Sequence, residues 1–117
     1  MRHRSGIYEA SISIVNLNEQ TEQSMRVEFR ASSVIDAILA AHAWGHERTA
    51  AMQSFTQVPL FLGCVKVHEW DPPVPREDGY IGAARSAFHL WEWKFDTGGD
   101  EPTRETLKHR LKRRVRA

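Results

Sequence analysis

The sequence predicts a two-layer α+β domain: an antiparallel sheet of about four strands, one packed central helix, and a basic C-terminal helix. Four stretches have the side-chain pattern of strands, two before and two after a central helical stretch. The central stretch begins with a helix cap and keeps its apolar residues on one helical face. The segment 103–117 has helical spacing as well. The predicted element order is therefore ββαββα.

The change from strand to helix is the clearest local signal. Apolar and charged residues alternate in Met25–Arg30, as in a half-buried strand. Ser33 is the expected N-cap, and Asp36 is an acidic residue in the first turn. The Ser33 hydroxyl and the Asp36 carboxylate both stabilise backbone N–H groups that lack hydrogen-bond partners at the start of a helix. We expect the helix to continue through Gly45, since one internal glycine costs only about 1 kcal/mol relative to alanine. The apolar face consists of Val34, Ile35, Ile38, Leu39, His42 and Ala43.

The other strands flank this unit. Ile7–Asn16 alternates and predicts the first strand, and the polar segment Leu17–Ser24 suits the hairpin loop after it. Val58–Trp70 is apolar on both sides in its first half, which is typical of a central strand. Gly63 within this run indicates a bulge or the close approach of a neighbour.

The fourth strand and the final helix follow a proline-rich loop, Asp71–Gly79. Pro102 and Thr103 then open a final helix, and we divide the chain into a domain, 1–102, and a basic C-terminal helix or tail, 103–117. In Ser86–Phe95, strict alternation places Phe88 and Leu90 on one side and His89, Trp91, Trp93 and Phe95 on the other.

The composition limits the classes of protein to which the chain can belong. A chain of 117 residues with 41% hydrophobic and 26% charged residues is expected to fold as one globular domain, alone or as a homo-oligomer. The single cysteine, Cys64, excludes an internal disulfide and fits a reducing, cytoplasmic location; its apolar surroundings predict a small core residue. The sequence has no apolar run of about 18 residues and no secretion signal, so we expect no membrane association.

The charge is unevenly distributed. Of 16 Lys and Arg and 15 Asp and Glu residues, segment 103–117 holds seven basic residues and one acidic residue, a net charge of +6. The rest of the chain therefore carries −5. Such a tail is typical of segments that contact phosphates, and the leading hypothesis is a non-enzymatic protein that binds DNA or RNA electrostatically. The residues predicted to make these contacts are Arg104, Lys108, Arg110, Lys112, Arg113, Arg114 and Arg116.

Two other interpretations of the tail remain open. The helix can dock on the acidic body. The protein would then be a protein-binding or inhibitory accessory module of the phage or mobile-element type, which contacts a protein partner through the acidic body and the proline-rich loop. A basic helix at a membrane surface is disfavoured, because its apolar stripe consists of Leu107, Leu111 and Val115 and lacks Trp and Phe. The passage Val27–Ala37 resembles the strand–cap–helix segments of many small bacterial and phage proteins. The resemblance concerns packing alone, so it implies no functional residue in this chain.

Trp91 and Trp93 are expected on one face of the fourth strand. If this face is open, the two indole rings are candidates for stacking on bases. If a helix covers it, they belong to the core. The sequence leaves both interpretations open.

His42 and His46 stand four positions apart on the predicted helix, a spacing that can direct two imidazoles at one metal ion. The motif differs from the His-Glu-x-x-His of zinc peptidases, since Ala43 follows the first histidine. A third ligand would have to come from the predicted strands, where His68, Glu69 and His89 are the candidates. The alternative, which we favour, is one half-buried histidine, one solvent-facing histidine and no metal site, because the spacing alone sets no coordination sphere. A small-ligand or metal-binding domain is therefore a third functional hypothesis. No motif for nucleophilic catalysis or phosphate binding is present, so we expect no enzyme activity and no cofactor.

Overall fold

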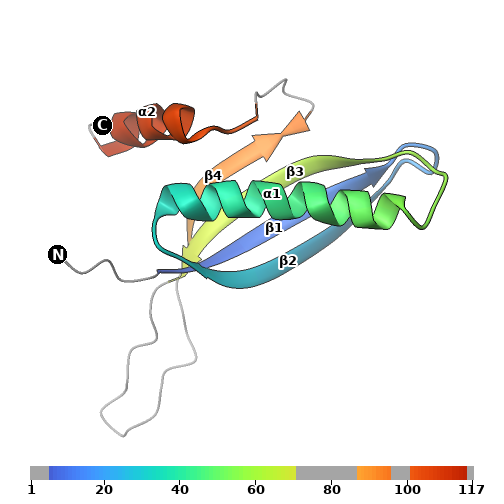
Figure 1. Cartoon of the computed structure of the whole chain (residues 1–117), viewed down its shortest axis with the longest axis horizontal. Helices are drawn as coiled ribbons and strands as arrows, with labels where there is room; N and C mark the ends of the chain where they lie inside the picture. Colours follow the sequence, from blue (N-terminus) through green and yellow to red (C-terminus); the bar gives the residue numbers. More distant parts are fainter. Residues whose placement is uncertain (1–5, 71–86, 96–100, 116–117) are drawn as a thin grey trace, which may run out of the picture.

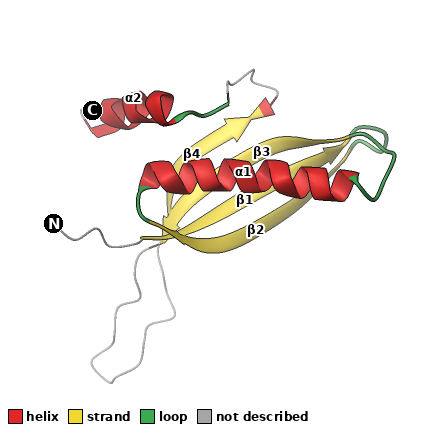
Figure 2. Ribbon diagram, viewed as in Figure 1, coloured by secondary structure: helices red, strands yellow, loops and turns green. Residues whose placement is uncertain are grey.

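The computed structural model describes residues 6–70, 87–95 and 101–115, with side chains as far as His109. The predicted fold class is confirmed: the elements follow one another in the order ββαββα, and one helix packs on a four-stranded antiparallel sheet (Figures 1 and 2). The elements are β1 (Gly6–Asn16), β2 (Thr21–Ala31), α1 (Val34–Gln53), β3 (Leu60–Trp70), β4 (Ala87–Lys94) and α2 (Arg104–Val115). The proline-rich loop Asp71–Gly79 lies outside the described residues.

The strands are arranged β2-β1-β3-β4, and α1 crosses one face of this sheet (Figure 1). The core lies between the two layers. Every second residue of β1, from Tyr8 to Ile14, is buried beneath α1. Fully burying a side chain the size of Ile12 or Ile38 stabilises the fold by about 1.5–3 kcal/mol, so this interface supplies most of the hydrophobic stabilisation.

Helix α1 begins at a side-chain cap, and the side chain of its last residue holds the segment that follows. Ser33 is the N-cap, as predicted, and its hydroxyl accepts a hydrogen bond of 3.1 Å from the backbone N–H of Asp36. The helix continues through Gly45, also as predicted, and ends at Gln53. The Gln53 side chain then donates to the carbonyl of Val58 and accepts from the N–H of Leu60, which fixes the turn into β3.

Gly45 lets α1 lie close to the sheet. A Cβ placed on this residue would meet both Cδ atoms of Leu62, at 3.0 and 3.1 Å, and Cγ2 of Ile12 at 3.3 Å. The conformational cost of the internal glycine is therefore offset by close packing of the two layers.

The loop predicted over Leu17–Ser24 is shorter than expected. Thr21–Ser24 belong to β2, and only residues 17–20 form the turn, with Gln20 at a φ of 53°. The prediction was wrong because β2 is an edge strand: its polar residues remain exposed while their backbone pairs with β1.

Two bulges shape the centre of the sheet. In β3, Ser13 pairs with Cys64 and Ile14 with Leu62, so Gly63 is the extra residue. A Cβ there would lie 2.8 Å from Cγ2 of Val15, which confirms both the predicted bulge and the predicted close approach. The central position of β3 is confirmed too.

The second bulge corrects the predicted faces of β4. Val67 pairs with Trp91 and His68 with His89, so Leu90 is the extra residue. His89 therefore lies on the face opposite to Trp91, whereas strict alternation had placed them together.

Helix α2 lies beside the N-terminal half of α1, on the β4 side of the sheet (Figure 1). Thr103 caps it, as the sequence predicts: its hydroxyl accepts a hydrogen bond of 3.2 Å from the N–H of Thr106. No helix in the described ranges is long and apolar enough to cross a membrane.

Candidate functional site

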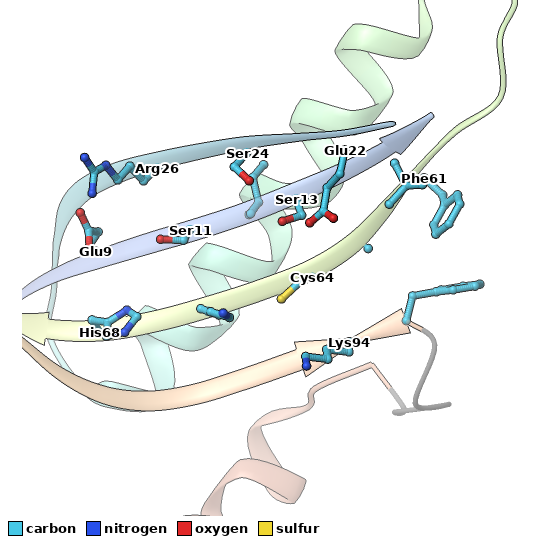
Figure 3. Close-up of a pocket in the computed structure, with 15 residues that line it drawn as sticks. Glu9, Ser11, Ser13, Glu22, Ser24, Arg26, Phe61, Cys64, His68 and Lys94 are labelled. Carbon is cyan, nitrogen blue, oxygen red and sulfur yellow. The ribbon is translucent and has the colours of Figure 1, made fainter. Parts of the chain in front are cut away.

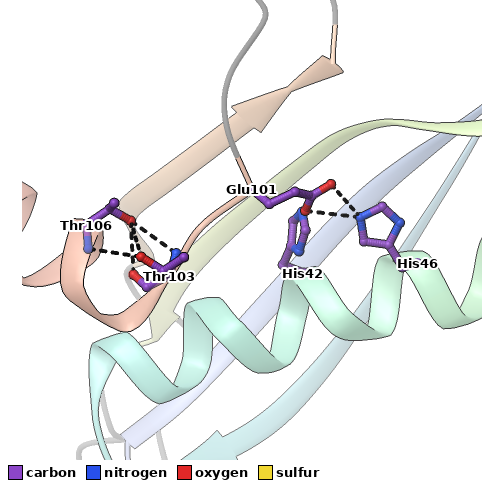
Figure 4. A network of polar contacts seen from close by, with 5 residues as sticks. All are labelled: His42, His46, Glu101, Thr103 and Thr106. Atoms are coloured by element: carbon purple, nitrogen blue, oxygen red, sulfur yellow. Dashed lines mark hydrogen bonds and ion pairs between the residues drawn. The ribbon is translucent and has the colours of Figure 1, made fainter.

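Three side chains with metal-binding chemistry meet where α1 faces the segment before α2 (Figure 4). The helix places His42 and His46 one turn apart, with ring centroids at 4.6 Å and ring planes at 76°. Glu101 reaches both rings: its Oε2 is 2.5 Å from Nε2 of His42, and its Oε1 is 3.2 Å from Nε2 of His46.

The three groups differ in exposure. His42 is 8% exposed, whereas the side chains of His46 and Glu101 are 49% and 60% exposed. The rings of Trp91 and Trp93 meet His42 edge-on, at centroid distances of 6.3 and 5.2 Å. One wall of the cluster is therefore aromatic, and the other side is open to solvent.

Nε2 of His42 is buried and lacks a well-aligned hydrogen bond. Although Glu101 lies close, the contact lacks hydrogen-bond alignment, and Nε2 has no hydrogen-bond partner among the described residues. Burial lowers the pKa of His42 from 6.5; Glu101 raises it in part, and His46 lowers it further. The neutral imidazole is therefore the dominant form at neutral pH.

This donor set suits a late first-row divalent cation. Two imidazole nitrogens and a carboxylate oxygen lie within 4.8 Å of one another. Imidazole and carboxylate ligands in this number are typical of zinc sites that keep a position for water, and of other two-histidine, one-carboxylate sites.

His68, one of the candidate third ligands from the sequence, does not join His42 and His46. It lies on the opposite face of the sheet, where its ring is 5.1 Å from that of His89. Glu101 takes its place, and sequence reasoning missed it because 55 positions separate it from His46. Its only signal in the sequence was an acidic residue just before the helix-opening Pro102.

Trp91 and Trp93 belong to the core. They are 6% and 7% exposed and lie in the hydrophobic cluster between the sheet and α1. A base cannot stack on rings buried in this way, so the stacking interpretation fails in this structure and the core interpretation stands.

The basic helix α2 is attached to the body at its first turns. The guanidinium of Arg104 donates a hydrogen bond of 2.7 Å to Oδ1 of Asp36, and Leu107 is 2% exposed. Lys108 is exposed. The backbone of Arg110, Lys112, Arg113 and Arg114 continues the helix, while their side chains and all of Arg116 lie outside the described part of the structure.

The sheet face away from α1 forms a shallow trough of about 710 Å³ (Figure 3). Its middle consists of the short side chains of Ser11, Ser13, Ser24 and Cys64, and its rim carries both acidic and basic groups. Cys64 lines this trough, so its predicted place in the core was wrong. Partial burial raises the pKa of its thiol, with Glu92 acting in the same direction, which disfavours the reactive thiolate.

No protein-family model matches the chain, and no curated protein or solved structure proved similar to it.

Proposed function

We propose that the protein binds the phosphate backbone of nucleic acid through the basic residues of α2 and its C-terminal continuation. The observation that carries this proposal is the charge separation: +6 over residues 103–117, against −5 over the rest of the chain. Phosphate contacts by Lys and Arg release counterions from the nucleic acid. This release supplies binding free energy that does not depend on the nucleotide sequence.

The docking of α2 supports the proposal. Leu107 and Arg104 attach the first turns to the body, so the helix projects from a fixed base. Arg104 is engaged by Asp36 and acts as an anchor, which leaves the phosphate contacts to the other basic residues of the tail. A 12-residue helix is about 18 Å long, enough to follow several phosphates of one strand.

The proposed binding does not depend on the nucleotide sequence. Trp91 and Trp93, the predicted stacking residues, are buried, and most of the exposed residues in the described first turns of α2 are charged. We therefore expect similar affinity for unrelated sequences of one length and strandedness, and strong weakening by salt.

The test compares charge removal from the tail with the same charge removal from the body. Fluorescence anisotropy measures binding to labelled single- and double-stranded DNA and to RNA at about 50 and about 200 mM salt. The tail variant is Lys112→Ala/Arg113→Ala/Arg114→Ala. The control, Arg26→Ala/Arg30→Ala/Arg48→Ala, loses three charges from exposed positions of the body.

We expect the tail variant to bind at least about tenfold more weakly and to lower the slope of log K against log salt by about 2–3, with the control close to wild type. Substitution is a sharper test than truncation after Pro102, because truncation also removes the buried Leu107. If the folded wild-type protein does not bind, or if both variants weaken equally, the proposal is wrong. A protein partner, the alternative function, would then be sought first.

A further inference from the structure

We propose that His42, His46 and Glu101 form a binding site for a late first-row divalent cation, with Zn²⁺ as the best fit and water completing the coordination. This inference goes beyond the proposed function and does not rest on it. It joins two elements far apart in the sequence, the middle of α1 and the segment before α2 (Figure 4).

The spacing of the ligands supports the site. Bonds of about 2.0–2.1 Å in a tetrahedral zinc site place ligand atoms about 3.3 Å apart. Nε2 of His46 already lies 3.2 Å from Oε1 and 3.3 Å from Oε2 of Glu101. Nε2 of His42 is 2.5 Å from Oε2, so this pair has to separate by somewhat less than 1 Å to receive an ion. Glu101 is mostly exposed, and its side chain is free to make that movement.

The burial of His42 is the second, independent observation. The residue is more than nine-tenths buried, and its Nε2 points at the carboxylate without an aligned hydrogen bond to any described group. Leaving a buried polar atom unsatisfied is costly. A cation between this nitrogen and Glu101 would satisfy it and would also neutralise the carboxylate.

The surroundings suit metal binding as well. The buried ring of His42 lies against the aromatic wall of the cluster. The edges of Trp91 and Trp93 restrict the orientation of its ring from one side. The exposed sides of His46 and Glu101 give an ion a path into the site.

His68 and His89 form the competing site. Their rings are 5.1 Å apart on the opposite face of the sheet, but no third ligand joins them among the described residues. A variant at His89 therefore distinguishes the proposed site from this pair, and His109 on α2 serves as a second exposed histidine for comparison.

The experiment uses the full chain without a histidine tag, freed of metal by a chelator that is then removed. Isothermal titration calorimetry measures the binding of Zn²⁺, and the visible spectrum of the Co²⁺ form reports the ligand geometry. The variants are His46→Gln and Glu101→Gln, both at exposed positions. The controls are His89→Gln and His109→Gln, and circular dichroism verifies that every variant is folded.

We expect one Zn²⁺ per chain. Each ligand variant should bind it at least about tenfold more weakly, since even the loss of a residue that only orients a ligand costs about 10–100-fold. The two controls should bind like the wild type. Saturating Zn²⁺ should also raise the melting temperature of the wild type by several degrees and that of Glu101→Gln by less. The absence of binding to the folded wild-type chain would overturn the proposal. So would wild-type affinity in His46→Gln, or loss of binding in His89→Gln.

Discussion

Asp36 links three parts of the molecule through one carboxyl group. Its side chain accepts hydrogen bonds from the hydroxyl of Ser32 and from Arg104, each at 2.7 Å, while its backbone N–H donates to Ser33. It also places a negative charge at the positive end of the α1 dipole. The same residue therefore supports the entry into α1 and contacts the first turn of α2.

This arrangement predicts a pH dependence of stability. Hydrogen bonds from Ser32, Arg104 and Ser33 lower the pKa of Asp36 from 3.8 to about 2. Between these two values the unfolded chain binds more protons than the folded one, so the contribution of Asp36 is complete above about pH 4 and is lost as the pH falls towards 2.

The measurement is a set of urea denaturation curves between about pH 2 and about pH 5, a window that spans both pKa values. Asp36→Asn should be less stable than wild type at the upper end, and the difference should shrink towards the lower end. Glu47→Gln, at an exposed position of the same helix, should follow the wild-type curve. A constant difference between Asp36→Asn and wild type across the window would contradict the assigned role.

At the scale of single elements, Gly45 sets the distance between α1 and the sheet. We expect Gly45→Val to destabilise the fold by about 1–3 kcal/mol, because its branched side chain would overlap Leu62 and Ile12. Valine is a better helix former than glycine, so a loss of stability can come only from crowding. Chemical denaturation measures the effect, and a Gly45→Val variant as stable as the wild type would show that the layers can move apart.

Ala43→Val is the matched control for this substitution. Ala43 is exposed on the same helix, although the sequence placed it on the apolar face, so the added side chain meets solvent there and only helix propensity changes. We expect a loss of about 0.5 kcal/mol. The difference between the two variants isolates the packing of α1 on β1 and β3.

The elements with local signals were predictable from the sequence. The Ser33 cap and the helix through Gly45 depend on neighbours in the chain, and the glycine at position 63 marks a bulge by its residue type; all three predictions are confirmed. The bulge at Leu90 was not predictable in this way. It depends on how β4 pairs with β3, and nothing in the alternation of Ser86–Phe95 marks the residue at which the register shifts.

The candidate site also combines residues that local sequence patterns predict with one that they do not. The pair His42 and His46 follows from helical spacing, but the third ligand depends on where the chain returns to α1. Glu101 comes from beyond β4, and a one-residue bulge is enough to exchange the faces on which His89 and Trp91 lie. The site residues that local patterns do not predict are therefore determined by strand pairing and by tertiary contacts.

For the whole molecule, the attachment of α2 determines whether the basic helix has a fixed base. Leu107 is among the largest fully buried side chains and belongs to the same hydrophobic cluster as the core of the sheet. The ion pair between Arg104 and Asp36 is exposed and contributes little by itself. Among the side chains of α2 that the structure describes, Leu107 therefore makes the main attachment to the body.

We accordingly expect Leu107→Ala to lower the free energy of unfolding by about 2–5 kcal/mol, because it removes a buried side chain and leaves a cavity beneath α2. Lys108→Ala, the neighbouring exposed position, should change stability by less than about 0.5 kcal/mol. Chemical denaturation measures both, and limited proteolysis should cleave the Leu107→Ala variant faster near α2. If Leu107→Ala matches the wild type in both measurements, α2 is not docked in solution. The basic segment would then act as a free tail, and Glu101 would lose the anchor that holds it beside His42 and His46.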